Sequence, residues 1–170
     1  MKRLYAGLIA LVAFALLAPL SALAGGVPWQ EPINTPDRFI ILASYENNAV
    51  FDAETGLVWE KSPSTTPQNW VAAQLFCNNK IVGNRRGWRL PIIQELASLG
   101  DPTRTNPALP AGHPFINVQS SVYWSASTVA SDATGAWGVL FSNGGVGNGF
   151  GKSFANFVWC VRGGQGVDPQ

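Results

Sequence analysis

The chain has 170 residues, with 11 basic and 10 acidic side chains and a formal net charge of +1. A near-neutral chain lacks the strongly basic face that nucleic-acid binding requires, so we expect no nucleic-acid partner. Gly, Pro and Trp are frequent, whereas charged residues make up only 12% of the chain. This composition argues against a helical bundle and favours strands, turns and ordered loops.

The first 24 residues have the pattern of a secretory signal peptide. A short basic start precedes an apolar run over 4–17, and Ala22-Leu23-Ala24 is a small-x-small cleavage site. The alternative is an uncleaved membrane anchor, since the run is almost long enough to cross a bilayer. We expect cleavage after residues 1–24, no membrane insertion afterwards, and a final place in the periplasm, at the cell surface or outside the cell.

The next elements are predicted from turn residues and alternation. Residues 25–37 contain three prolines and are interpreted as a linker or lead-in that is not helical. Residues 38–45 are a strand candidate. Residues 49–52 and 57–60 are predicted to form a hairpin, with Gly56 supplying the positive φ of the return.

A first helix is predicted to begin with Thr66 as its N-cap and Pro67 at its first position. One face of this helix points inward because four of its residues follow the i, i+3, i+4, i+7 spacing. These residues are Trp70, Ala73, Gln74 and Cys77.

Pro91 is predicted to open a second helix, whose Ile92, Leu96 and Leu99 form an apolar stripe that we assign to the core. An irregular, proline-rich segment over 100–112 follows. Long segments of this kind are usually functional or ordered by packing.

The end of the chain, 123–164, alternates apolar side chains with small or polar ones, a pattern typical of strands. Residues 142–145, Ser-Asn-Gly-Gly, are suited to a hairpin turn. We therefore predict a terminal antiparallel sheet that is buried on one face and includes a last strand with Phe157, Trp159 and Val161.

Cys77 and Cys160 are the two cysteines of the chain. In an exported protein such a pair is expected to form a disulfide, here between the first helix and the last strand. Closing this loop would stabilise the fold by about 4.5 kcal/mol on the chain-entropy model. The alternative, a reactive thiol, has no adjacent basic group to lower its pKa.

Six motifs follow one another along the chain. They are ENNAVFDAETGLVWEKSP at 46–63, the helix with its cysteine, GWRLPIIQEL at 87–96, YWSAS at 123–127, AWGVLFSNG at 136–144 and VWCVRGG at 158–164. In this order they resemble the Lcl C-terminal-like domain, a bacterial domain of unknown function that also forms the terminal module of a collagen-like adhesin.

The resemblance covers 38–165, leaving 166–170 as a tail. It implies an α+β, C-type-lectin-like fold related to formylglycine-generating enzymes: two helices on antiparallel sheets, long irregular loops and one helix-to-last-strand disulfide. One departure is Ile92, where the family commonly has Thr. Losing that N-cap would cost the helix about 1 kcal/mol unless another group caps it.

No catalytic residue, cofactor or metal is expected. The carboxylates that a calcium site needs are missing from the sheet region, and a zinc site would need more His or Cys. The formylglycine enzymes need a reactive cysteine pair near the C-terminus, where this chain has Cys160 alone. His113 is a single loop histidine with no motif that places a serine beside it.

The tract 142–157 combines glycines with amides and aromatic residues, and such groups make an adaptable contact surface when exposed. The alternative is a plain hairpin tip. Family members diversified by retroelements vary in this tract, and its composition is compatible with that history. Candidate binding residues are Trp137, Ser142, Asn143, Asn148, Phe150, Phe154 and Asn156.

Other motif residues are assigned to structure. Arg89 is expected to pair with Glu95 or with backbone carbonyls, and Lys80, Arg85 and Arg86 are either a solvated loop or a docking site for an anionic polysaccharide. The structural residues are Trp59, Trp88, Arg89, Glu95, Trp124 and Arg162.

We expect an exported, non-catalytic binding or adhesion module that contacts a glycan or protein through the terminal hairpin. An envelope structural domain without a small ligand is the alternative, and an enzyme is a third. A deep pocket lined by converging polar groups would favour the enzyme. The sequence does not define an oligomeric state.

Overall fold

A computed structural model of the chain describes residues 38–164. The expected signal peptide (1–24), the lead-in (25–37) and the tail (166–170) lie outside the described residues. Along 38–164, no helix is both long enough and apolar enough to cross a membrane.

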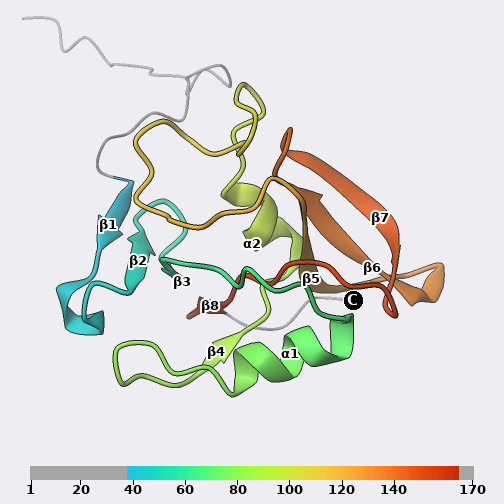
Figure 1. The fold of residues 1–170 in the computed structure, drawn as a ribbon, viewed down its shortest axis with the longest axis horizontal. Helices are drawn as coiled ribbons and strands as arrows, with labels where there is room; N and C mark the ends of the chain where they lie inside the picture. Colours follow the sequence, from blue (N-terminus) through green and yellow to red (C-terminus); the bar gives the residue numbers. More distant parts are fainter. Residues whose placement is uncertain (1–37, 165–170) are drawn as a thin grey trace, which may run out of the picture. The chain divides into compact units, whose positions relative to one another are not determined.

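The described residues form eight strands, two α-helices and a short 3-10 helix (η1), shown in Figure 1. In chain order these are β1 (Phe39–Ile41), η1 (Ala43–Tyr45), β2 (Ala49–Asp52), β3 (Leu57–Glu60), α1 (Trp70–Asn78), β4 (Trp88–Arg89), α2 (Ile93–Ser98), β5 (Val122–Val129), β6 (Asp132–Leu140), β7 (Gly145–Gly151) and β8 (Val161–Arg162).

The strands make two antiparallel sheets. One has the order β1-β2-β3-β8-β4, and the other has the order β5-β6-β7. The expected α+β class with two helices and antiparallel sheets is confirmed.

The last strand differs from the sequence prediction. β8 contains only Val161 and Arg162, and it pairs with β3 and β4 instead of extending the sheet of the terminal hairpin. The chain leaves that sheet after β7, and Phe157 makes only an isolated bridge to Tyr123. The apolar alternation at the C-terminal end therefore reflects burial between two sheets and not one continuous strand.

The hairpin over 49–52 and 57–60 has the predicted bounds, with Val50 opposite Trp59 and Gly56 at φ +71°. The strand expected over 38–45 is shorter. It ends at Ile41 because the chain turns through η1 and then through Glu46, which has a left-handed φ of +55°.

The first helix begins three residues later than predicted, at Trp70. Gln68 forms an isolated β-bridge with Asn156, so the chain is still extended there. Asn69 is the N-cap, and its Oδ1 accepts a hydrogen bond from the Ala72 N–H at 2.9 Å. The assignment of Thr66 as the cap is therefore wrong.

This difference gives a direct test. Asn69→Ala is expected to lower the free energy of unfolding by about 1 kcal/mol, because an N-terminal N–H of the helix loses its acceptor. Thr66→Ala is the matched control and is expected to change stability by less than about 0.5 kcal/mol. Urea titration measures both variants, and a larger cost at Thr66 than at Asn69 would contradict the observed helix start.

The second helix, α2, follows an N-cap residue, Ile92, that has no side-chain acceptor. Two other groups take its place: Glu95 Oε2 accepts from the Ile92 N–H at 3.0 Å, and Ser127 Oγ accepts from the Ile93 N–H at 3.0 Å. The first N–H groups of this helix are thus paired partly by its own Glu95 and partly by Ser127 of β5, and the second bond also fixes α2 against that strand.

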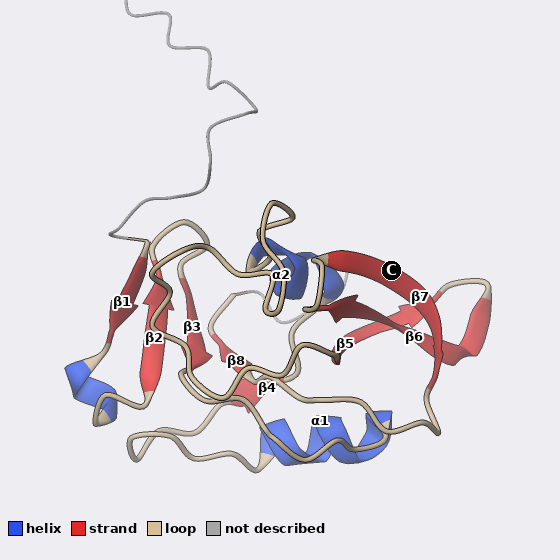
Figure 2. Ribbon diagram, turned by 45° about the horizontal axis from the view of Figure 1, so that its top comes forward, coloured by secondary structure: helices blue, strands red, loops and turns tan. Residues whose placement is uncertain are grey.

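The two helices lie on opposite faces of the β5-β6-β7 sheet, as Figure 2 shows. Leu96 and Leu99, at the end of α2, share a buried cluster with Tyr123 and Val139. A second cluster joins α1 to the other face and contains Ala73, Cys77, Trp124 and Ala136.

The expected disulfide is present. Cys77 on α1 is bonded to Cys160, which directly precedes β8, with a Cα–Cα distance of 5.4 Å. Both residues are fully buried. The bond therefore joins the first helix to the last strand across 83 residues of sequence.

The residues assigned to structure are either buried or paired within the fold. Arg89 makes a bidentate pair with Glu95, with both distances 2.7 Å, and also donates to the Gly163 carbonyl. Arg162 donates to the hydroxyl of Tyr45. The buried tryptophans are Trp59, Trp88, Trp124 and Trp159.

Candidate functional site

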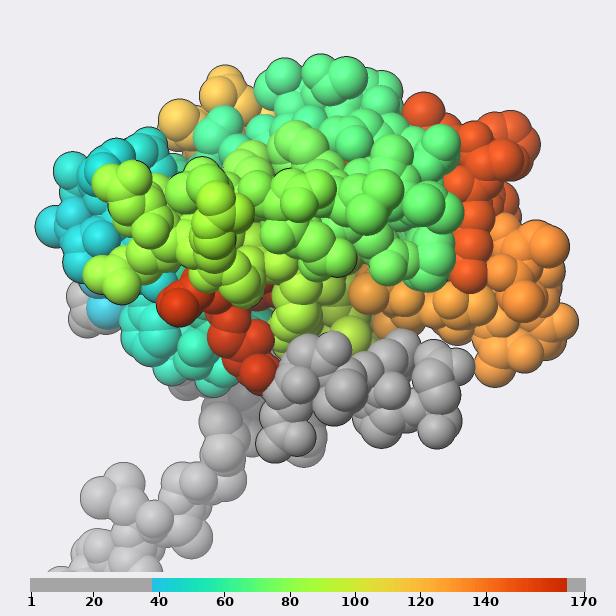
Figure 3. Space-filling model, turned by 90° about the horizontal axis from the view of Figure 1, so that it is seen from below, coloured from blue at the N-terminus to red at the C-terminus, as the bar shows by residue number. Residues whose placement is uncertain are grey.

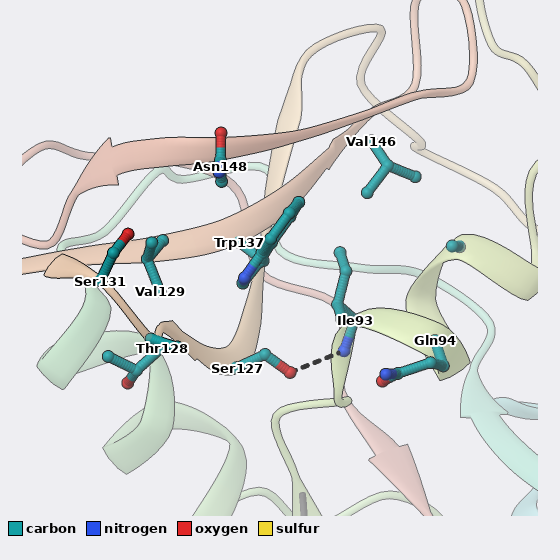
Figure 4. A pocket seen from close by; sticks show the side chains of 11 residues that line it. Ile93, Gln94, Ser127, Thr128, Val129, Ser131, Trp137, Val146 and Asn148 are labelled. Carbon is teal, nitrogen blue, oxygen red and sulfur yellow. Dashed lines mark hydrogen bonds between the residues drawn. The ribbon is translucent and has the colours of Figure 1, made fainter. Parts of the chain in front are cut away.

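An open pocket of about 700 Å³ lies between α2 and the β5-β6-β7 sheet, as Figure 4 shows. It is lined by residues from one helix, three strands and the β5–β6 turn. These residues are Ile93, Gln94, Ala97, Ser127, Thr128, Val129, Ala130, Ser131, Trp137, Val146 and Asn148.

Trp137 stands on the sheet and projects into this pocket (Figure 4). Successive side chains of a strand alternate between faces, so Trp137 shares its face with Val139, two residues along β6. Val139 is fully buried in the cluster that contains Leu96 of α2, whereas Trp137 is only half-buried. The short helix therefore covers one end of this face and leaves the Trp137 end open.

Both neighbouring strands are irregular opposite Trp137. On one side, Trp124 pairs with Gly138 and Thr128 with Ala136, which places two extra residues in β5. On the other, Gly138 pairs with Gly147 and Ala136 with Phe150, which places one extra residue in β7. Bulges re-aim side chains and occur often beside functional sites.

Side-chain hydrogen bonds hold the irregular part of β5 in place. Ser125 Oγ donates to the Trp137 carbonyl at 2.8 Å and accepts from the Ser127 N–H at 3.2 Å. Ser127 in turn accepts from Ile93 at the start of α2. The backbone under Trp137 is thereby tied to the helix on the other side of the pocket.

The lining of the pocket is uncharged, although Lys152 Nζ, outside the lining, donates to the hydroxyl of Thr128 at 2.9 Å. None of its lining side chains is ionisable, and its polar groups are the amides of Gln94 and Asn148 and the hydroxyls of Ser127, Thr128 and Ser131. An apolar surface with a few amides and hydroxyls can hold an uncharged group, whereas a buried ion would lose hydration without gaining a partner.

The structure brings together only some of the expected binding residues. Trp137 and Asn148 both line the pocket. Asn143 lies in the β6–β7 turn, where its Oδ1 accepts from the Gly145 N–H at 3.0 Å. Ser142, the preceding turn residue, is half-buried and does not line the pocket.

The other candidate binding residues do not line the pocket. Phe150 was expected to face solvent, but it is half-buried and packs edge-on against the buried Trp124, on the opposite face of the sheet. Asn156 bridges to Gln68 through the backbone. Phe154 is exposed, at 70% of its surface, and lies outside the pocket.

The contributions of α2 and of the end of β5 were not anticipated. Ile92 was assigned to a core stripe, yet the next residues, Ile93, Gln94 and Ala97, form one side of the pocket. The signal for β5 was the YWSAS motif, where Ser125 and Ser127 lie two residues apart and so share one face of the strand. Small hydroxyl side chains on the buried face of a strand indicate that they form hydrogen bonds there, because they contribute little apolar surface to a core.

The basic side chains and the histidine considered as candidates each contact a different partner in the fold. Lys80 pairs with Glu60 at 2.5 Å, whereas Arg85 stacks on the ring of Tyr45 at 4.7 Å, so they do not form one anion-binding cluster. His113 stacks on Phe115, and burial lowers its pKa. Among residues 38–164, no group of three His, Cys, Asp or Glu side chains could hold a metal ion.

Glu60 is a buried carboxyl beside the disulfide. It accepts from the Cys160 N–H at 3.0 Å and pairs with Lys80. Burial raises its pKa, and the neighbouring Lys80 and the Cys160 N–H only partly offset this effect. The folded protein therefore holds this proton to a higher pH than the unfolded chain does.

The raised pKa of Glu60 fixes the direction in which stability changes with pH. Because the folded state binds the proton more tightly, the contribution of Glu60 to the unfolding free energy falls as pH rises above its ordinary pKa of 4.5. The stability of the wild type minus that of Glu60→Gln should therefore decrease as the pH rises above 4.5. Chemical unfolding of both proteins measures this difference, and a difference that grows with pH would contradict the assigned direction.

The described residues thus define an α+β domain that is closed by one disulfide and presents an uncharged, open pocket on its smaller sheet. The model of the family described as the Lcl C-terminal domain matches residues 48–162. This match spans well over half of the chain, and the chain belongs to that family. No curated protein shows a significant match.

Proposed function

We propose that the protein is an exported, non-catalytic binding or adhesion module that holds a protein or glycan partner at its terminal hairpin. The observation that carries this proposal is the open pocket around Trp137, which presents an aromatic ring beside amides and hydroxyls. Half-exposed aromatic side chains with adaptable polar neighbours are typical of contact surfaces.

The chemistry of the pocket supports binding over reaction. General acid–base catalysis needs a titratable group within hydrogen-bond reach of the substrate, and nucleophilic catalysis needs an activated nucleophile. No histidine, lysine or carboxylate lines the pocket, and the ionisable neighbour of its hydroxyls, Lys152, lies outside the lining and donates to Thr128 Oγ1 at 2.9 Å, so it is a donor there and not a base. Ser127 is already engaged with the backbone of α2.

Two features support export. Residues 1–24 have the three-part pattern of a signal peptide. The Cys77–Cys160 disulfide, which is buried, is the kind of bond that persists in oxidising compartments. Cell fractionation tests this part: the chain should be found outside the cytoplasm without residues 1–24, and an intact cytoplasmic chain would contradict it.

Glycan and protein arrays probed with the exported chain test the site itself. Trp137→Ala is expected to weaken every specific interaction by about tenfold or more, as for a central aromatic contact. Phe154→Ala is the matched control, because this exposed aromatic is also a candidate binding residue but lies outside the pocket. Equal binding by the two variants would overturn the assignment of the site.

A second variant keeps this test independent of stability. Asn148 is exposed, so Asn148→Ala removes a pocket amide without opening the core. We expect a weaker interaction and an unchanged unfolding free energy. Binding that survives both Trp137→Ala and Asn148→Ala would show that the pocket is not the contact surface.

One observation favours the alternative of an envelope structural domain. On the face in Figure 3, α1 is exposed, and two of its apolar side chains, Val71 and Leu75, keep 59% and 56% of their surface accessible. A domain that packs on another protein through α1 should lose that partner on Leu75→Gln and keep it on Trp137→Ala. The opposite pattern supports the pocket.

A further inference from the structure

Among residues 38–164, β7 pairs with β6 on one side only, so it forms a free edge of the three-stranded sheet. It has seven residues, Gly145–Gly151, with neither a charged side chain nor a proline. Native proteins usually protect exposed edges with charges, prolines or covering segments, because an edge offers unpaired N–H and C=O groups to another strand. Charge and proline are both missing from this one.

Hydrogen bonds at the two ends of β7 show which groups are unpaired. At the turn, the Leu140 carbonyl accepts from the Gly144 N–H at 2.9 Å, and at the other end the Lys152 N–H donates to the Thr134 carbonyl at 2.8 Å. Residues of an antiparallel strand alternate between bonding the neighbouring strand and facing away from it. Because Leu140 faces β7 and is paired with Gly145, the polar backbone groups of Val146 point away from β6.

The free edge and the pocket adjoin each other. The side chains of Val146 and Asn148, both on β7, form part of the pocket wall, as Figure 4 shows. A strand added to this edge would lie about 4.8 Å from β7, and its alternate side chains would share the face of Val146 and Trp137.

We propose that the partner is an extended segment of another protein that adds to β7 as a fourth strand. One of its uncharged apolar side chains enters the pocket around Trp137. This inference rests on the proposed function, since it names the class of partner for the same site. Backbone hydrogen bonds to the edge supply affinity, and the pocket selects the side chain.

Charge determines which segment fits. Neither β7 nor the pocket lining contains an ionisable side chain. A charged side chain entering the pocket would lose hydration with no opposite charge in the lining, and the adjacent Lys152 is already engaged with the Thr128 hydroxyl and the Ala133 carbonyl. An uncharged segment meets no such cost. A glycan could contact Trp137, but it has no row of amide N–H and carbonyl groups to match the edge.

The test uses the full exported chain and a linear peptide of roughly seven to ten residues, the length that pairs along β7. The peptide is selected on this chain from a displayed library. Val146→Pro removes the outward N–H of Val146, and Val146→Ala, the matched control, shortens the same side chain but keeps that N–H. We expect Val146→Pro to lower the affinity for the peptide by about tenfold or more, and Val146→Ala to lower it by less than about threefold.

A second measurement does not depend on how the variants fold. Methylation of alternate backbone nitrogens of the peptide leaves its side chains in place but removes the donors that would pair with β7. One of the two methylated registers should bind at least about tenfold more weakly than the parent peptide. Equal binding by both registers and the parent would overturn the proposal.

The remaining outcomes separate the two levels of inference. A glycan that requires Trp137 and binds Val146→Pro as tightly as Val146→Ala would overturn strand addition and leave the proposed function standing. Strand addition would also be overturned if the library yielded no enriched peptide. The same holds if Trp137→Ala and Val146→Pro both left the affinity for the selected peptide unchanged. A dimer of the chain, seen by light scattering and abolished by Val146→Pro alone, would identify a second copy as the occupant and reject a different protein.

Discussion

Loss of the Cys77–Cys160 bond is expected to lower the free energy of unfolding by about 4.5 kcal/mol on the chain-entropy model. The bond closes a loop across 83 residues of sequence, so the unfolded chain gains much conformational freedom when it is removed. Replacing both residues with Ala also leaves two fully buried side chains slightly smaller. Guanidinium unfolding of the oxidised wild type and of the Cys77→Ala/Cys160→Ala variant measures the effect.

Reducing agent provides the control for this prediction. It should destabilise the wild type by a similar amount and leave the double variant unchanged, because that variant has no thiol to reduce. A loss of less than about 1 kcal/mol in the double variant would show that the bond does not limit the unfolded chain as the model requires.

Asp52→Ala is expected to lower the free energy of unfolding by about 3–5 kcal/mol, the range for removing one partner of a buried ion pair. Both oxygens of Asp52 accept from Arg38 at 2.9 Å, and Arg38 is only 3% exposed. The variant would leave this guanidinium buried beside an empty space. Its remaining contacts would be the Ser98 carbonyl at the end of α2 and Glu54.

Glu54→Ala is the matched control for Asp52. Glu54 also contacts Arg38, at 3.0 Å, but 44% of its side chain is exposed, so water screens the pair. Removing this side chain is expected to lower the free energy of unfolding by no more than about 1 kcal/mol. Urea titration compares the two variants, and similar losses for both would contradict a structural role for the buried pair.

Local signals in the sequence were sufficient for several elements. The β2–β3 hairpin has its predicted bounds because alternation, the turn residues and Gly56 all favour the same register. The disulfide followed from the pair of cysteines and the expectation that the chain is exported. The inward face of α1 was also predicted, since Ala73 and Cys77 are fully buried.

The errors occurred where distant contacts override local patterns. Thr66 and Pro67 have good helix-start chemistry, yet the chain stays extended until Asn69 because Gln68 pairs with Asn156, far along the chain. The apolar alternation around Trp159 suggested a strand beside the terminal hairpin. The observed β8 instead enters the other sheet, between β3 and β4.

The candidate site was only partly predictable for the same reason. Trp137 and Asn148 were candidates by composition, and both line the pocket. Phe150 has the same composition signal but packs against Trp124, because the extra residue in β7 sets which face each side chain takes. No local pattern places Ile93 opposite Trp137, since that proximity depends on how α2 packs on the sheet.

Hydrogen–deuterium exchange of the chain, alone and with the peptide or glycan that the binding experiments select, tests the central claim most directly. We predict slower exchange in β7 and in 127–131, around Trp137, and unchanged exchange in α1. Protection confined to α1, with the pocket strands exchanging as in the free protein, would contradict the assignment of the Trp137 pocket as the binding surface.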